Sequence, residues 1–75
     1  MSFTVQVLNE NDDPVKHAKV MLSFKDYTNS IEYTDSDGYA YFDSHKNNRE
    51  MTVYVNGNDY DEYTYEDGES ITITI

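Results

Sequence analysis

The chain has 75 residues and no cysteine, so we expect one small domain (residues 1–75) with a thin core and neither a disulfide nor a thiolate metal site. Fifteen Asp and Glu residues against five Lys and Arg residues give a formal net charge of −10. This charge repels nucleic acid and anionic lipid and attracts basic surfaces. No apolar run approaches the roughly 20 residues of a membrane helix. The strand-like pattern from Phe3 leaves no room for a signal peptide, so we expect a soluble, cytoplasmic protein.

The negative charge is concentrated toward the C-terminus. Residues 1–49 contain eight acidic and five basic residues, a net charge of −3, whereas residues 50–75 contain seven acidic residues and no base, a net charge of −7. High charge can indicate disorder. Eight Tyr and three Phe residues, together with clear strand patterns, argue against that interpretation.

The first part of the chain alternates apolar and polar residues with the period of two that is typical of strands, not the 3.6-residue period of a helix. Residues 3–7 form the first expected strand. An Asn- and Asp-rich turn follows at residues 9–14, where these side chains bond their own backbone. Residues 18–25 form the best-marked strand.

The middle of the chain continues the alternation. After a polar loop, Ile31 and Tyr33 share one face of a short strand. Residues 35–38, Asp-Ser-Asp-Gly, predict a tight hairpin turn in which the glycine has a positive φ. Residues 39–42 form the next strand, and residues 44–49 a loop.

The last third begins with a strand over residues 51–55, closed by Asn-Gly-Asn at 56–58. Residues 59–67 are acidic and lack regular alternation. A turn at Asp67-Gly68 leads to the final strand, residues 71–75. We expect most of the core to come from residues that share one face of their strand, namely Val5, Val7, Ala18, Val20, Leu22, Phe24, Ala40, Phe42, Met51, Val53, Val55, Ile71 and Ile73. Six or seven short strands at this spacing predict an all-β sandwich or barrel.

Three segments resemble carboxypeptidase regulatory-like domains and the related bacterial immunoglobulin-like and collagen-adhesin B-type domains. Residues 14–20 are similar to their Pro-Val-x-x-Ala-x-Val segment, although Asp13 replaces the usual preceding glycine. Residues 34–42 resemble their Thr-Asp-x-x-Gly-x-Ala-x-Phe hairpin, and residues 53–60 resemble their next strand. The resemblance implies a small antiparallel immunoglobulin- or transthyretin-like β-sandwich. It implies little about function, because such domains serve as spacers, adhesive modules and accessory domains.

Asp35 and Asp37 invite a calcium interpretation. An EF-hand loop would require further acidic ligands where Tyr33 and Ser44 stand. We therefore interpret this segment as a turn in which Asp side chains accept hydrogen bonds from backbone amides.

No combination of residues suggests catalysis. His17 and His45 are the only histidines, and we expect both on the surface without convergent ligands or a nucleophile. A sandwich of this size has little volume for a substrate cleft of about 300 Å³ or more. We therefore expect no enzyme activity, no cofactor and no bound metal.

Residues 59–67 are the most unusual segment, with five carboxylates and three tyrosines interleaved. The ordinary interpretation is a solvated, self-repelling edge that prevents pairing with other chains. The alternative is a protein-binding surface, in which tyrosines supply contact area and carboxylates about 6.8 Å apart imitate a phosphate backbone. The candidate binding residues are Asp59, Tyr60, Asp61, Glu62, Tyr63, Tyr65, Glu66 and Asp67.

Two functional hypotheses follow. The first is an interaction protein whose acidic, Tyr-rich face occludes a basic surface on another protein, as small phage-encoded inhibitors of host defence nucleases do, although no motif matches a particular inhibitor family. It would act in the cytoplasm of the host cell. The second is a structural or adhesive module of a larger bacterial surface protein. Neither involves nucleic acid or membrane as the partner, and the oligomeric state is left open.

Overall fold

The computed structural model describes residues 3–43 and 48–75, which form seven strands and no helix. The strands are β1 (Phe3–Leu8), β2 (Lys19–Phe24), β3 (Asn29–Tyr33), β4 (Tyr39–Phe42), β5 (Arg49–Val55), β6 (Asn58–Tyr65) and β7 (Ser70–Thr74). The prediction of an all-β fold with six or seven short strands is confirmed. The described residues accordingly include no helix that could cross a membrane.

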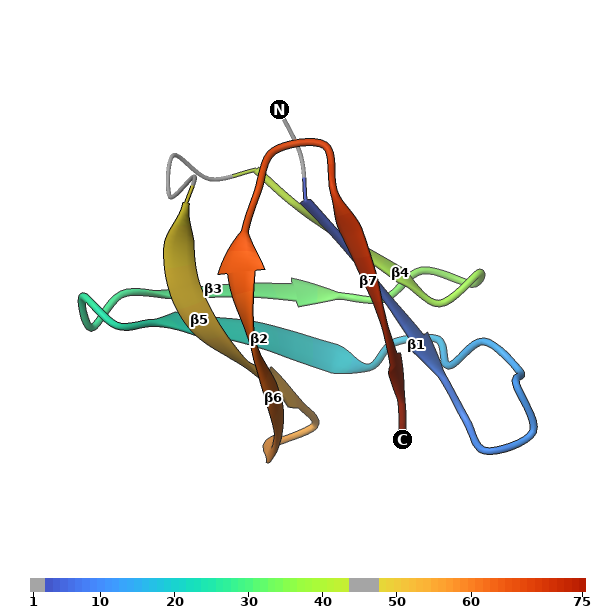
Figure 1. Ribbon diagram of the computed structural model, residues 1–75. Helices are drawn as coiled ribbons and strands as arrows, with labels where there is room; N and C mark the ends of the chain where they lie inside the picture. The colour runs from blue at the N-terminus through green and yellow to red at the C-terminus, as the bar shows by residue number, and fades with distance from the viewer. Residues whose placement is uncertain (1–2, 44–47) are drawn as a thin grey trace.

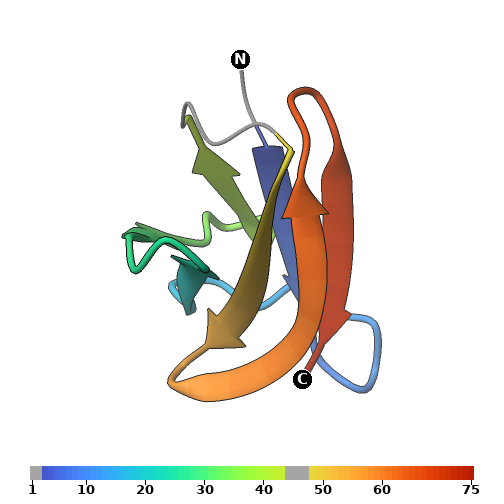
Figure 2. The same ribbon diagram turned by 60° about the vertical axis from the view of Figure 1, so that its left-hand side comes forward.

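The strands form two sheets, which are packed as a small sandwich (Figures 1 and 2). One sheet has the order β4-β1-β7 and the other the order β3-β2-β5-β6. Every pair is antiparallel except β1 and β7, which are parallel. The first and last strands of the chain therefore lie side by side, a pairing that completes the smaller sheet.

The core lies between the sheets and is formed by the alternate residues of the strands that face inward. Each of the residues expected in the core is buried except Ile71, which is half-buried and packs against the others. Phe3, on the same strand face as Val5 and Val7, is also fully buried, and so is Tyr65, which was expected on the surface. The alternation predicted the core well because successive side chains of a strand point to opposite faces.

Two turns are each stabilised by the same kind of hydrogen bonding from a side chain to the backbone. Asn9 Oδ1 accepts hydrogen bonds from the backbone amides two and four residues further on, at 2.8 and 3.0 Å. Asp35 Oδ1 does the same, at 2.9 and 3.0 Å. This confirms the prediction that the Asp35 side chain stabilises a turn through backbone amides.

The prediction that residues 35–38 form a hairpin is wrong in one respect. The flanking strands β3 and β4 belong to different sheets, so the turn carries the chain from one layer to the other. Gly38 has the expected positive φ, 82°. A Cβ atom there would lie 2.8 Å from the Val7 carbonyl oxygen, so the site is closed to other residues on steric grounds as well.

Two further expectations concern loops. His17 is exposed, as expected. Residues 44–47, including His45, lie outside the described residues. Arg49, expected in that loop, is already part of β5.

Candidate protein-binding surface

The acidic segment, residues 59–67, lies in a β-strand for most of its length. β6 begins directly after the two-residue turn Asn56-Gly57, whose φ angles of 52° and 86° are both positive. Positive φ at both positions is characteristic of the type I′ turn that closes antiparallel hairpins. The segment therefore pairs with β5 as an edge strand of the four-stranded sheet.

A β-bulge interrupts this strand. Tyr54 faces Asp59 and Thr52 faces Glu62, so two residues of β6, Tyr60 and Asp61, lie opposite the single residue between them on β5. One extra residue in a strand shifts the phase of every side chain beyond it. The bulge explains why the segment lacks a regular alternation in the sequence.

This phase shift places Tyr63 and Tyr65 on the same side of β6 as Tyr60, toward the core. Tyr60 and Tyr63 are half-buried and pack against the core. Tyr65 is fully buried (0% exposed), with its ring centroid 5.0 Å from that of Phe3 and 5.9 Å from that of Phe24. The prediction of Tyr65 as a surface binding residue is therefore wrong, and Tyr60 and Tyr63 offer only part of their surface.

The acidic residues of the segment are separated from its tyrosines. Asp59, Asp61 and Glu62 are exposed on β6, and Glu66 is exposed just beyond its end. Asp67 is half-buried in the turn leading to β7. The evenly spaced row of carboxylates does not form, because the bulge breaks the alternation and the next residue on the side of Glu62 is Thr64.

The exposed carboxylates share a surface with residues from the other three strands. This surface, the outer face, is the solvent side of the sheet β3-β2-β5-β6. Its side chains follow from the strand registers, which pair Lys19 with Tyr33, align Ile31, Met21, Tyr54 and Asp59 in one row, and align Asn29, Ser23, Thr52 and Glu62 in the next. Neighbouring strands are about 4.8 Å apart, so each four-residue row is roughly 14 Å long.

The outer face has an apolar part beside its acidic edge. Tyr33 is 62% exposed and Ile31 44% exposed on β3, while Met21 and Tyr54 are half-buried. These residues were not predicted to form part of a binding surface. Met21 and Tyr54 alternate with core residues in their strands, which indicates that they face outward. Only the register brings them into one row with Ile31.

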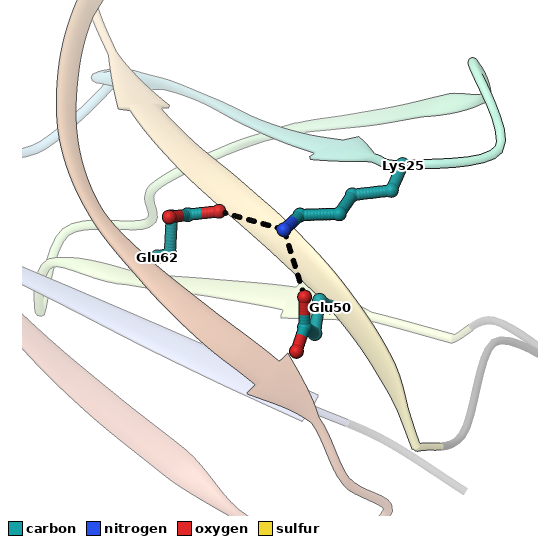
Figure 3. Close-up of polar contacts among 3 residues, drawn as sticks. All are labelled: Lys25, Glu50 and Glu62. Atoms are coloured by element: carbon teal, nitrogen blue, oxygen red, sulfur yellow. Dashed lines mark ion pairs between the residues drawn. The ribbon is translucent and has the colours of Figure 1, made fainter.

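An ion-pair cluster neutralises part of the acidic edge. Lys25, just after β2, places its Nζ atom 2.8 Å from Glu50 Oε2 and 3.3 Å from Glu62 Oε1 (Figure 3). The hydrogen bond to Lys25 lowers the pKa of Glu50, and the hydrogen bonds from Lys25 to Glu50 and Glu62 raise the pKa of Lys25. All three side chains are exposed, so the cluster adds little stability.

Asp59 and Asp61, by contrast, have no ion-pair partner within the described part of the chain. Residues 3–43 and 48–75 also contain no group of three His, Asp or Glu residues that could hold a metal ion. The outer face thus offers chemistry suited to contact, namely the uncompensated carboxylate of Asp59 next to exposed apolar side chains, with Asp61 exposed in the adjacent bulge.

Comparison with known proteins adds no identification. No protein-family model matches the chain, and no curated protein matches it.

Proposed function

We propose that this protein is a non-catalytic binding module whose outer face covers a basic surface on a partner protein. The supporting observation is the row Ile31, Met21, Tyr54 and Asp59, which combines exposed apolar area with a carboxylate on one sheet face. Apolar contact supplies binding energy after water is excluded, and charge gives orientation and a fast encounter. The aromatic contacts in this proposal come from Tyr33 and Tyr54, in place of the tyrosines of β6.

The partner's chemistry follows from the charges of the face. A net charge of −10 attracts cations over long range, and Asp59 and Asp61 are free to pair with them at contact. A matching surface would present Lys or Arg residues next to an apolar area. The mechanism is occlusion, which needs no turnover and no cofactor.

The proposal is tested by reversing Asp59 and Asp61 to Lys. The matched control reverses Glu10 and Asp13, two exposed carboxylates in the β1–β2 loop; in both variants two reversals change the net charge from −10 to −6. Glu62 is left unchanged because it pairs with Lys25. Proteins retained from a lysate at low salt are identified for wild type and both variants, and association rates of the recovered partner are measured against ionic strength.

We expect the Asp59/Asp61 reversal to abolish retention, whereas the control should slow association only modestly. Replacing Ile31 and Tyr33 with Ser should mainly accelerate dissociation, because apolar contacts form after encounter. Identical sets of retained proteins for wild type and the Asp59/Asp61 variant would contradict the proposal.

A second candidate function is a structural or adhesive module of a larger protein. The resemblance of residues 14–20 and 34–42 to regulatory-like and adhesin domains supports it. Such a module would need no acidic outer face. Identical sets of retained proteins for wild type and the Asp59/Asp61 variant would therefore favour this candidate.

A further inference from the structure

The hairpin that joins β2 and β3 lies at one end of the four-stranded sheet (Figure 1). Tyr27 is in its loop. Its amide donates to the Phe24 carbonyl at 3.1 Å, and the Phe24 amide donates to the Thr28 carbonyl at 2.9 Å. This is a three-residue loop whose last position requires a left-handed backbone. Tyr27 occupies that position with a φ of 68°.

A large aromatic residue is unfavourable at this position. The left-handed region suits Gly and Asn, and bulky side chains are strained there. Among the described residues, six of the seven other positions with positive φ follow that preference, because they hold Gly, Asn or Asp; the exception is His17, with a φ of 59°. The choice of Tyr in the hairpin loop is therefore not explained by the needs of the turn.

Burial does not explain Tyr27 either. Its side chain is 97% exposed, the highest value among the large hydrophobic residues described. The turn is held instead by Asp26, whose Oδ1 accepts hydrogen bonds from the Thr28 hydroxyl at 2.5 Å and the Thr28 amide at 3.2 Å. Tyr27 thus combines backbone strain with full exposure of an aromatic ring, both of which disfavour it in the isolated protein.

The surroundings of the hairpin loop are acidic. Lys25 is engaged by Glu50 and Glu62, so with Asp26 these residues have one positive and three negative charges, a net charge of −2. A shallow hollow lies beside them, lined by Lys25, Glu50, Glu62, Tyr63 and Thr64. A group approaching the ring from a partner would therefore meet negative charge on that side.

We propose that Tyr27 is an anchor that inserts into an apolar pocket of the partner protein, a pocket bordered by Lys or Arg residues. Tyrosine is enriched at such energetically dominant positions because it buries a large rigid ring while its hydroxyl keeps a hydrogen-bond partner. The inference rests on the proposed function, since it assumes the same basic partner. It adds a second contact region at the end of the sheet, beyond the apolar row of the outer face.

The test replaces Tyr27 with Asn, which the left-handed position prefers. The probe is the partner recovered by wild type, purified and titrated at known concentration. We expect the Tyr27→Asn variant to melt at the same temperature as wild type or higher, and to bind about 30-fold more weakly, the size of a typical anchor residue's loss. Tyr27→Phe should bind within about threefold of wild type, because the ring is kept.

Tyr41→Asn is the matched control, since Tyr41 is also largely exposed (57%) but lies on β4 of the other sheet. We expect its affinity to be unchanged. Wild-type affinity in the Tyr27→Asn variant, with the Asp59/Asp61 reversal still defective, would overturn this inference alone. Failure of wild type to retain any partner would overturn the proposed function and this inference together.

Discussion

At the scale of single residues, Tyr65 changes the interpretation of the acidic segment most. It was expected among the binding tyrosines, but it fills the core between Phe3 and Phe24 and its hydroxyl donates to the Phe42 carbonyl at 3.4 Å. A buried aromatic residue of this size contributes to stability, so its removal would alter binding only by unfolding the protein.

We predict that Tyr65→Ala lowers the free energy of unfolding by about 3–5 kcal/mol, the usual cost of truncating a buried aromatic ring. Tyr65→Phe keeps the ring and loses the hydroxyl with its hydrogen bond to the Phe42 carbonyl, so it should cost about 0.5–1.5 kcal/mol. Urea denaturation of both variants measures the two values. A Tyr65→Ala protein as stable as wild type would place this side chain on the surface after all.

Thr34 is the one buried polar side chain of the described residues, at 3% exposure. Its hydroxyl donates to the Val15 carbonyl at 2.6 Å and accepts from the Ala18 amide at 2.8 Å. These bonds tie the segment before β2 to the end of β3. One side chain therefore satisfies two backbone groups that no strand pairing reaches.

Thr34→Val should lower the free energy of unfolding by about 2–5 kcal/mol, because it keeps the shape but leaves a buried donor and a buried acceptor unsatisfied. Thr34→Ser is the control. It keeps the hydroxyl and loses one methyl group, worth about 0.8 kcal/mol. Chemical denaturation of the two variants in parallel gives the comparison, and equal losses would show that packing, not hydrogen bonding, matters at this site.

At the scale of elements, the bulge in β6 decides which side chains reach solvent. The bulge also bends β6, which is an edge strand, and β6 has exposed charged residues. A bend and charges on an edge strand both oppose pairing with other chains. The ordinary interpretation of the acidic segment, a protected edge, is therefore compatible with the structure. The proposed binding role uses the outer face of the same strand.

Deleting Asp61 should be tolerated. Without it, the residues of β6 alternate regularly from Asn58, and Tyr60, Tyr63 and Tyr65 keep their inward positions. We expect a folded protein that melts within a few degrees of wild type. Deleting Thr64 shortens the strand equally but moves Tyr65 to the outward position, so it should cost about as much as Tyr65→Ala. Thermal melts followed by circular dichroism separate the two, and unfolding of the Asp61 deletion would mean that the bulge itself is required.

At the scale of the whole molecule, charge works against a small core. Seven of the acidic residues lie in residues 50–75, where there is no base, and Lys25 pairs with two of them, Glu50 and Glu62. Mutual repulsion of like charges favours an expanded chain. The ion pairs of Lys25 are exposed, so they offset little of it.

The melting temperature should therefore rise with salt. Raising sodium chloride from about 0.01 M to 0.5 M shortens the Debye length several-fold, which screens the repulsion more than it weakens one exposed cluster. Calorimetry across this range measures the effect. A flat or falling melting temperature would mean that favourable charge pairs balance the repulsion. Adding calcium should raise the melting temperature only as far as its ionic strength does. A larger, saturable rise would contradict the turn interpretation of Asp35.

Local patterns along the chain were enough to predict the class of fold, nearly all of the core and the chemistry of the local turns. Alternation with period two is a property of each strand alone, so Val20, Leu22 and their equivalents could be assigned without knowing the partner strands. Asn9 and Asp35 bond amides within four residues, and such local contacts are also readable from sequence. The exposure of Asp59, Asp61 and Glu62 followed from their charge.

The pairing of the strands and their phase could not be predicted in this way and follow from contacts in the folded chain. The parallel pairing of β1 with β7 joins two strands that are far apart in the sequence. Residues 35–38 do the opposite, because they separate the consecutive strands β3 and β4 into different sheets. The direction of the β6 tyrosines depends on a bulge defined against β5. The apolar row of the outer face exists only through the registers of four strands. Each of these features depends on contacts between distant residues, which the alternation within a single strand does not encode.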